Sequence, residues 1–289
     1  MIDVIQLINF KSHKETVLNL KKLNVLTGQN GVGKSSVIQS LLILRQTHQK
    51  NRLNKVLELN SPLCFIGKSS DAIYKFPNEE YENQIGIRLA DHQNAYSWLF
   101  ENLKYKDSTY LDRVNDVDDT SGYEDLSLFT ENFQYLSALR GIEYLTDDYA
   151  VEFDKQISIN EGKGELVAQF LSEYGKKHRV IETLKHPLEK DDFLLNQVSA
   201  WEKEISKNVN VSPVKFGDGY DIKYSFDTPN LLGPIDELSK KNVGFGLSYA
   251  LPIIVAILSA EKDSLLLIEN PEAHIHPYGI SKLTELICL

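Results

Sequence analysis

Apolar and polar residues alternate at the start of the chain. The segments DVIQLINF at 3–10 and TVLNL at 16–20 flank a polar turn, and KLNVLT at 22–27 runs directly into glycine-rich sequence. Alternation with a period of two predicts β-strands with one buried face. We therefore expect three short strands, the first two of which form an antiparallel hairpin.

A helical period replaces this alternation after the glycine-rich stretch. In SSVIQSLLILRQ at 35–46 the apolar residues recur at the spacing of one helix face. The third strand, a glycine loop and a helix are thus predicted in that order.

The middle of the chain, from 52 to 241, has a different character. It mixes strand-like pieces such as QIGIRLA and AYSWLF with helical pieces such as GELVAQFLSEYG and DFLLNQVSAWEKEIS. The stretch 107–131 is rich in acidic residues and polar spacers, which is typical of a solvated loop. These mixed short elements indicate an insertion.

The end of the chain returns to the starting pattern. A glycine turn at 244–246 opens a long apolar helix, and DSLLLIEN at 263–270 is expected to form a buried strand that ends in an acid. The core is therefore split, which gives three predicted parts: an N-terminal core part at 1–60, an inserted subdomain at 61–235 and a C-terminal core part at 236–289.

Composition and charge narrow the class of protein. The chain has 289 residues, of which 42% are hydrophobic and 25% charged, as in soluble globular proteins. A net charge of −10 gives no support to DNA binding, which would need a local basic groove. Cys64 and Cys288 have no disulfide or zinc-site spacing, and no apolar run is long enough for a bilayer. We expect a cytoplasmic protein without membrane contact.

The segment GQNGVGKS at 28–35 fits the pattern G-x-x-x-x-G-K-[ST], with a predicted strand before it and a helix after it. In such a loop the backbone N–H groups and the helix N-terminus surround a phosphate chain. Lys34 would reach the β- and γ-phosphates of ATP, and Ser35 would bind Mg²⁺. The expected nucleotide contacts in this loop are Gly28, Asn30, Gly31, Gly33, Lys34, Ser35 and Ser36.

A second acidic site is needed to hold Mg²⁺ and to orient a water molecule. Glu269, at the end of the predicted strand 265–268, stands where this acid is expected, so we predict that it shares the metal with Ser35. A zinc site formed by Glu272, His274 and His276 is the alternative, although His-x-His at a helix start does not place both rings on one face.

Taken together, these motifs resemble the RecF/SMC/OLD-like branch of ABC-class ATPases, in particular bacterial AAA-family ATPases. The resemblance covers most of the chain. It rests on LINFKSH at 7–13, TGQNGVGKSSVIQSLLILRQ at 27–46, YLSALR at 135–140, LLNQVSAWEKEI at 194–205 and LLLIENPEAHIHP at 265–277. The fold it implies is an α/β P-loop NTPase with a mixed sheet, an N-terminal antiparallel β layer and an inserted, largely helical lid.

The resemblance also implies an ATP-dependent homodimer, in which a signature segment of one subunit completes the nucleotide site of the other. NVGFGLSYALP at 242–252 is the candidate signature. Gly244 and Gly246 would offer backbone N–H groups to the γ-phosphate, and Ser248 would add a hydroxyl group. A capped core helix, with glycine where two backbones pack closely, is the alternative reading.

The acidic site departs from the common pattern, in which an aspartate precedes a catalytic glutamate. Here Asn270 follows Glu269, and an amide binds water but takes no proton from it. Glu272 is then the candidate for polarising the water, or hydrolysis is slow. The alternative is a non-catalytic switch or scaffold that uses ATP only to close.

Further residues carry smaller predictions. Ser12 lies either near the base or ribose of the nucleotide or in a plain surface turn, together with His13. Arg140 is expected to form a structural ion pair, with a phosphate-sensing role as the alternative. His274 and His276 are expected to cap and orient the loop after Glu269, and Trp201 to lie in the core.

The chain stops at Leu289, before the histidine-bearing strand that proteins of this branch have after the acidic site. We expect either a truncated chain or completion by a partner. The resemblance implies a slowly hydrolysing ATPase that regulates a partner effector, in anti-phage defence or DNA maintenance.

Overall fold

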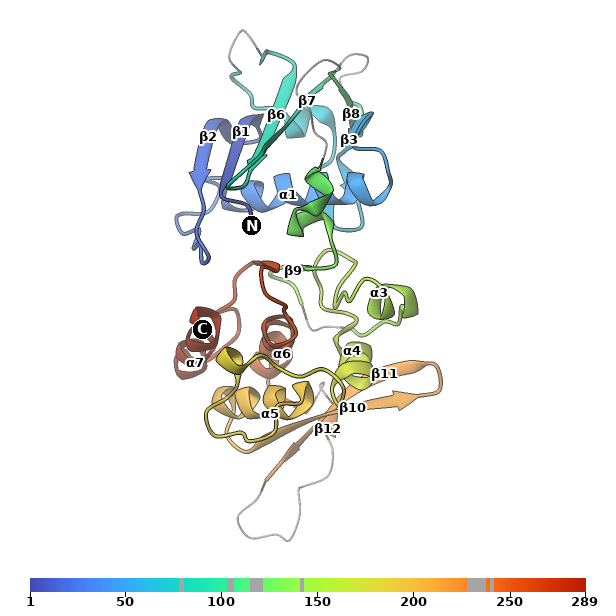
Figure 1. The fold of residues 1–289 in the computed structure, drawn as a ribbon, viewed down its shortest axis with the longest axis vertical. Coiled ribbons are helices and arrows are strands. Elements are labelled where there is room, and N and C mark those ends of the chain that lie inside the picture. Colours follow the sequence, from blue (N-terminus) through green and yellow to red (C-terminus); the bar gives the residue numbers. More distant parts are fainter. Residues whose placement is uncertain (78–80, 103–106, 115–121, 141–142, 228–237, 240–241) are drawn as a thin grey trace. The chain divides into compact units, whose positions relative to one another are not determined.

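The computed structural model describes residues 1–289 except 78–80, 103–106, 115–121, 141–142, 228–237 and 240–241. The chain divides into two compact units, an N-terminal unit at Met1–Thr130 and a C-terminal unit at Glu131–Leu289. Figure 1 shows the elements of both. No helix of the described ranges is both long enough and apolar enough to cross a bilayer.

An antiparallel sheet of six strands forms the N-terminal unit, in the order β2-β1-β6-β7-β8-β3. The strands are β1 (Val4–Phe10), β2 (His13–Asn19), β3 (Val56–Glu58), β6 (Gln84–Ala90), β7 (Ala95–Glu101) and β8 (Tyr110–Arg113). Alternate residues of β1, such as Ile5 and Leu7, are buried, as their period of two requires. The predicted N-terminal hairpin and antiparallel layer are confirmed.

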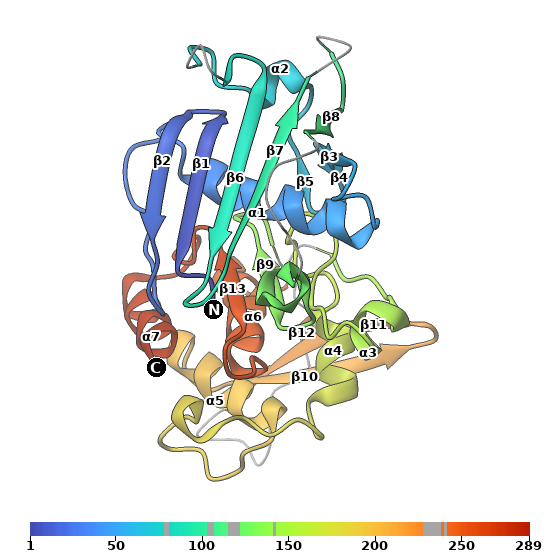
Figure 2. The same ribbon diagram turned by 45° about the horizontal axis from the view of Figure 1, so that its top comes forward.

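Helix α1 (Lys34–Gln49) lies along one face of this sheet (Figure 2). Its core side buries Leu41, Leu42 and Leu44, which the helical period had selected. The smaller elements of the unit are β4 (Asn60–Ser61), β5 (Cys64–Phe65), α2 (Ser69–Ala72) and the 3₁₀ turns η2 (Tyr123–Asp125) and η3 (Ser127–Phe129).

Three expectations for this unit need correction. The segment 22–27 forms no strand, because it pairs with no strand of its own unit, and Val25 is 76% exposed. Strands β6 to β8, which the sequence analysis places in an inserted β/helical lid subdomain at 61–235, extend the N-terminal sheet beyond β1. The acidic stretch 107–131 is no simple solvated loop, since it contributes β8 and the buried Leu128; residues 115–121 within it lie outside the described residues.

The C-terminal unit consists of helices around two small sheets. Its helices are α3 (Asp148–Glu152), α4 (Val167–Tyr174), η4 (Glu182–Leu184), α5 (Leu194–Ile205), α6 (Phe245–Leu258) and α7 (Pro277–Cys288). Its strands are β9 (Phe133–Leu136), β10 (Val209–Phe216), β11 (Gly219–Phe226), β12 (Leu238–Ser239) and β13 (Leu265–Ile268). Strands β10, β11 and β12 form one sheet, and β9 and β13 pair in parallel.

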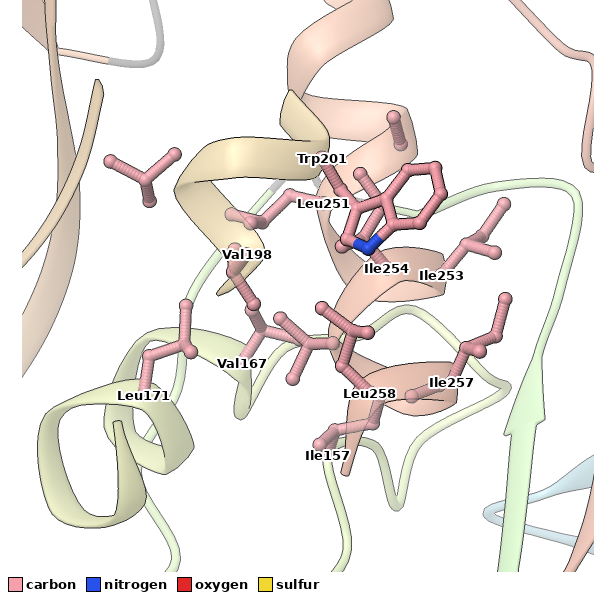
Figure 3. Packing of buried hydrophobic residues seen from close by; sticks show 14 of the residues in the cluster. Ile157, Val167, Leu171, Val198, Trp201, Leu251, Ile253, Ile254, Ile257 and Leu258 are labelled. Carbon is pink, nitrogen blue, oxygen red and sulfur yellow. The ribbon is translucent and has the colours of Figure 1, made fainter. Parts of the chain in front are cut away.

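The apolar helix α6 is the centre of this unit. Every residue from Leu247 to Leu258 is buried, so the helix is enclosed on all sides, as a helix that is apolar all round must be. Figure 3 shows Val198 and Trp201 of α5 and residues of α4 packed around it. The indole N–H of Trp201 donates to the carbonyl of Leu184 at 3.2 Å, and the predicted core position of Trp201 is confirmed.

The acid Glu202 is buried in this core. The side chain of Glu202 on α5 is 0% exposed, and neither of its carboxylate oxygens has a hydrogen-bond partner. Burial raises the pKa of Glu202 well above its ordinary value, because an unpaired charge is costly in an apolar medium. The folded protein therefore keeps the proton of Glu202 to a higher pH than the unfolded chain does.

This burial predicts that the substitution Glu202→Gln increases the stability of the fold by an amount that depends on pH. The unfolded chain releases the proton above about pH 4.3, whereas the folded chain keeps it, so wild-type stability falls as pH rises from that value towards the raised folded pKa. Glutamine does not titrate. The stability of Glu202→Gln relative to wild type should therefore increase from pH 4 upward, by at most about 1.4 kcal/mol per pH unit. Urea unfolding at several pH values measures it.

The same substitution at Glu152, which is exposed on α3, is the matched control. A stability difference for Glu202→Gln that stays constant between pH 4 and pH 8 would contradict a protonated, buried carboxyl group.

Candidate functional site

The glycine loop of the N-terminal unit has a backbone that favours glycine at three positions. Gly28, Gly31 and Gly33 have φ values of +146°, +82° and +104°. A Cβ atom on Gly33 would lie 2.3 Å from Ser12 Oγ and 2.7 Å from His13 Nε2, so this position also excludes a side chain by contact. Gly33 is the N-cap of α1, and the loop therefore ends at the helix N-terminus that the motif requires.

Lys34 is the first residue of α1, and its ammonium group lies over the loop. Its Nζ donates to the carbonyl oxygens of Gly28 and Gln29, at 2.7 Å each. Asn30 and Ser35 are exposed beside it, whereas the side chain of Ser36 is buried on the core side of the helix. The cation is thus held against the glycine loop at the N-terminus of α1, where a phosphate chain would bind.

The β1–β2 hairpin is fastened to this loop through His13. Its Nε2 lies 3.1 Å from the carbonyl oxygen of Gly33, and its Nδ1 lies 3.0 Å from Thr16 Oγ1. Because a carbonyl oxygen only accepts, Nε2 carries a proton. The structure therefore places Ser12 and His13 against the glycine loop rather than in a detached surface turn.

The acidic site of the C-terminal unit begins where β13 ends. Ile268 pairs with Leu136 of β9, and the N–H of Glu269 donates to the carbonyl of Leu136 at 2.8 Å. The Glu269 carboxylate accepts a hydrogen bond from the Tyr135 hydroxyl at 2.9 Å. All four residues of β13 are half-buried instead of buried, because β9 is its one partner among the described strands.

Arg140 is buried and clamps the loop that follows Glu269. Its Nε donates to the carbonyl of Tyr249 on α6 at 3.0 Å. Its terminal nitrogens donate to the carbonyls of Ser137 at 2.6 Å, Glu269 at 2.7 Å and Asn270 at 2.8 Å. The expected ion pair is therefore wrong, since the acceptors are backbone carbonyls. Burial lowers the pKa of Arg140 to about 10, so the side chain stays a cation at neutral pH.

The loop 270–276 is a tight turn. Asn270 and His274 have positive φ values of 44° and 62°, and the side chains of Asn270 and Glu272 are exposed. His276 is the N-cap of α7, where its Nδ1 accepts from the N–H of Tyr278, so its predicted capping role is confirmed. The ring of His274 packs edge-on against Tyr249, with 4.5 Å between the ring centroids.

The zinc alternative receives no support. Among the described residues, no three side chains of His, Cys, Asp or Glu come together in a group that could hold a metal ion. Zinc needs such a group, because its protein sites have at least three ligands of these types.

The residues of the candidate signature at 242–252 lie in different environments. Gly244 is the exposed N-cap of α6, and a Cβ atom there would meet nothing within 4 Å. A Cβ on Gly246 would lie 3.0 Å from the carbonyl oxygen of His274, so this glycine serves close packing within the chain. Ser248 is 5% exposed on the core side of α6, and its predicted contact with a partner's phosphate stays a prediction.

The structure thus brings the predicted residues together in two groups, one around Gly33 and Lys34 and one around Glu269. The predicted sharing of a metal by Ser35 and Glu269 joins the two units and stays a prediction. Sequence reasoning missed the role of Tyr135. The signal was present in YLSALR, which the resemblance had singled out without a function for its tyrosine.

Comparisons with known proteins give two separate matches, one that includes Lys34 and one that includes Glu269. Residues 1–90 match a family model described as an AAA ATPase domain. Residues 168–289 match an AAA domain model whose description refers to an AbiEii toxin and a type IV TA system.

Two curated relatives and one solved structure are similar to the chain. The DNA double-strand break repair Rad50 ATPase of Pyrococcus abyssi is 31% identical over 124 residues, which are 39% of this chain and 14% of the relative. The DNA replication and repair protein RecF of Clostridioides difficile is 31% identical over 91 residues, 29% of this chain and 24% of the relative. The chain matches less than a quarter of either relative's length. A crystallised Smc head, bound to the C-terminal winged-helix domain of ScpA, aligns with a TM-score of 0.43 and 16% identity, over 99% of this chain and 85% of that one.

A glycine loop with its lysine at the head of a helix, within a mixed α/β fold, defines a P-loop nucleotide-binding protein. Both matching family models describe AAA domains, and the chain is similar to the Rad50 and RecF proteins named above. The resemblance inferred from its motifs is confirmed.

The clamp predicts a large loss of stability for Arg140→Lys. A single ammonium group does not reproduce the fork that reaches four carbonyls on three segments, and each buried carbonyl left without a donor costs about 1–3 kcal/mol. We expect the free energy of unfolding to fall by about 3 kcal/mol, measured by urea denaturation.

Arg179→Lys is the matched control, because Arg179 is exposed and pairs with Asp192 at the surface. Equal unfolding midpoints for the two variants would show that the Arg140 contacts do not hold the loop.

Proposed function

We propose that the chain binds Mg²⁺-ATP with its glycine loop and with the acid at the end of β13, and that it hydrolyses ATP slowly. The observation that carries the proposal is the position of Lys34, whose ammonium group lies over a glycine loop at the head of α1. That arrangement has one common use, which is to hold the β- and γ-phosphates of a nucleotide.

The proposed donor atoms suit Mg²⁺. Ser35 supplies a hydroxyl and Glu269 a carboxylate, and Mg²⁺ prefers oxygen ligands of this kind alongside phosphate oxygens. When bound, the metal neutralises charge that develops on the phosphates. Lys34 and the backbone N–H groups of the loop would hold the phosphate chain.

Slow turnover follows from the residues around Glu269. Asn270 binds a water molecule but accepts no proton from it, which leaves the carboxylates of Glu269 and Glu272 to polarise the nucleophile. Glu272 is exposed two residues after Asn270, where a bound nucleotide or a partner could meet it. A non-catalytic switch that closes on ATP is the second candidate, and Asn270 is the observation that favours it.

Dimerisation through the nucleotide sites is part of the proposal. Gly244 at the N-terminus of α6 is exposed with open space around it, and Phe245 next to it is 74% exposed. A glycine that the chain itself does not need there fits close approach by a second subunit's nucleotide.

The dimer would regulate a partner effector in DNA maintenance or anti-phage defence. The names of the similar Rad50 and RecF proteins refer to DNA repair and replication, and one matching family refers to a toxin system. Direct DNA contact is not part of the proposal, because the net charge is −10. Neither Cys64 nor Cys288 forms a disulfide bond, which fits a cytoplasmic location.

Phosphate release from wild type and three variants tests the proposal. Lys34→Ala should abolish nucleotide binding, since it removes the cation of the glycine loop. Glu269→Gln should lower kcat by about 100-fold or more and trap an ATP-bound dimer, detected by light scattering. Glu272→Gln should lower kcat to the extent that its carboxylate polarises the water.

Glu152→Gln is the control for removing a carboxylate from the same unit. Equal background rates in wild type, Glu269→Gln and Glu272→Gln would leave only the non-catalytic switch. Unaltered nucleotide binding by Lys34→Ala would overturn the assignment of the glycine loop.

A further inference from the structure

The hydroxyl of Tyr135 contacts the Glu269 carboxylate. Tyr135 lies on β9, opposite Leu267 in the register of the parallel pair, and its hydroxyl donates to Glu269 Oε1 at 2.9 Å. The tyrosine is 7% exposed, so its hydroxyl is removed from bulk water and directed at this acceptor. A hydrogen bond to a carboxylate from a buried donor is stronger than a neutral pair at the surface.

The tyrosine ring is itself fixed. Gly162 lies so close that a Cβ atom there would be 2.8 Å from Cδ1 and Cε1 of Tyr135 and 2.5 Å from the backbone nitrogen of Ser137. The φ of Gly162 is +69°, and its carbonyl accepts from the N–H of Ser137 at 2.9 Å. A glycine turn thus lies directly on the aromatic ring and restricts its movement.

The segment YLSALR at 135–140, which begins with Tyr135, also holds the backbone of Glu269. Arg140, five residues after Tyr135, donates to the carbonyls of Glu269 and Asn270. One short segment therefore fixes Glu269 twice, through its side chain and through its main chain. Holding only the backbone would leave the carboxylate free to rotate about its own side-chain bonds.

We propose that Tyr135 is a positioning residue, which orients the Glu269 carboxylate towards the Mg²⁺ ion and the attacking water. This inference rests on the proposed function of Glu269. A donor behind a metal-binding or catalytic carboxylate fixes its orientation, and loss of such a donor typically lowers metal affinity or activity by 10- to 100-fold, on the order of magnitude seen for outer-shell partners.

Tyr135→Phe tests the inference, because it removes the hydroxyl and keeps the ring. Tyr220→Phe is the matched control: the Tyr220 hydroxyl donates to Glu173 Oε1 at 3.0 Å, the same type of bond in the same unit and apart from the acidic site. Three quantities are measured for the full chain: kcat, KM for ATP, and the Mg²⁺ concentration that gives half-maximal binding of a fluorescent ATP analogue.

We expect Tyr135→Phe to lower kcat by about 10-fold, to leave KM for ATP within about twofold, and to raise the half-saturating Mg²⁺ concentration by a similar factor of about 10. Tyr220→Phe should change none of the three. In the Glu269→Gln background, Tyr135→Phe should add no further loss, since both changes then act on one interaction.

Equal behaviour of Tyr135→Phe and Tyr220→Phe would overturn the inference, as would a full additional loss in the double variant, which indicates a purely structural role. In either case hydrolysis by wild type and its loss in Lys34→Ala would leave the proposed function intact. If wild type binds the ATP analogue without hydrolysing ATP, the half-saturating Mg²⁺ concentrations of wild type, Tyr135→Phe and Tyr220→Phe decide whether the inference holds. If wild type binds no nucleotide, or binds it independently of Mg²⁺, the role of Glu269 fails and the inference fails with it.

Discussion

The arrangement of the C-terminal unit depends on one buried guanidinium group. Arg140 links three segments that are distant in the sequence: the loop after β9, the helix α6 and the loop after β13. Its acceptors are all main-chain carbonyls, so the link is independent of the side chains on those segments. A buried cation without a carboxylate partner is tolerable here because several carbonyl dipoles surround it.

This clamp also connects two candidate functional elements. Tyr249, whose carbonyl it holds, lies one turn inside the helix that begins at Gly244, and Glu269 lies at the end of β13. A shift of α6 would therefore move Arg140 and, with it, the backbone of the acidic loop at Glu269 and Asn270. The contact between Gly246 and the carbonyl of His274 joins the same two elements a second time, and it explains why glycine is needed there without any ligand. The conformation of the loop after β13 thus determines both its packing against α6 and the position of Glu269.

Much of this could be predicted from the sequence, and the failures have physical causes. Strands β1, β6 and β7 and helices α1, α5 and α6 follow from strong local periodicity, which is the part of folding that neighbours along the chain decide. The partner of a strand is not local. The sequence therefore placed β6 to β8 in a separate lid, although they extend the N-terminal sheet.

The site shows the same limit. The glycine loop and Glu269 were recognisable because their residue types carry the chemistry. The contacts of Arg140 could not be recognised in this way, because every residue has a backbone carbonyl and the sequence does not show which of them accept hydrogen bonds. Ser248 was assigned to a contact with a partner's phosphate because it follows two glycines, and its burial on the enclosed helix α6 did not enter that assignment. The strand expected at 22–27 needs a neighbour, and no strand of its own unit provides one.

The central claim is that Ser35 and Glu269 hold one magnesium ion. The most direct measurement is the distance between Ser35 Oγ and the nearer Glu269 carboxylate oxygen in crystals grown with Mg²⁺ and a non-hydrolysable ATP analogue. Two oxygens that serve one octahedral ion, directly or through one of its waters, lie within about 5 Å of each other, and this is the result we predict. A separation of more than about 10 Å, with nucleotide bound at Lys34, would contradict the account, because no single ion could then be reached by both groups.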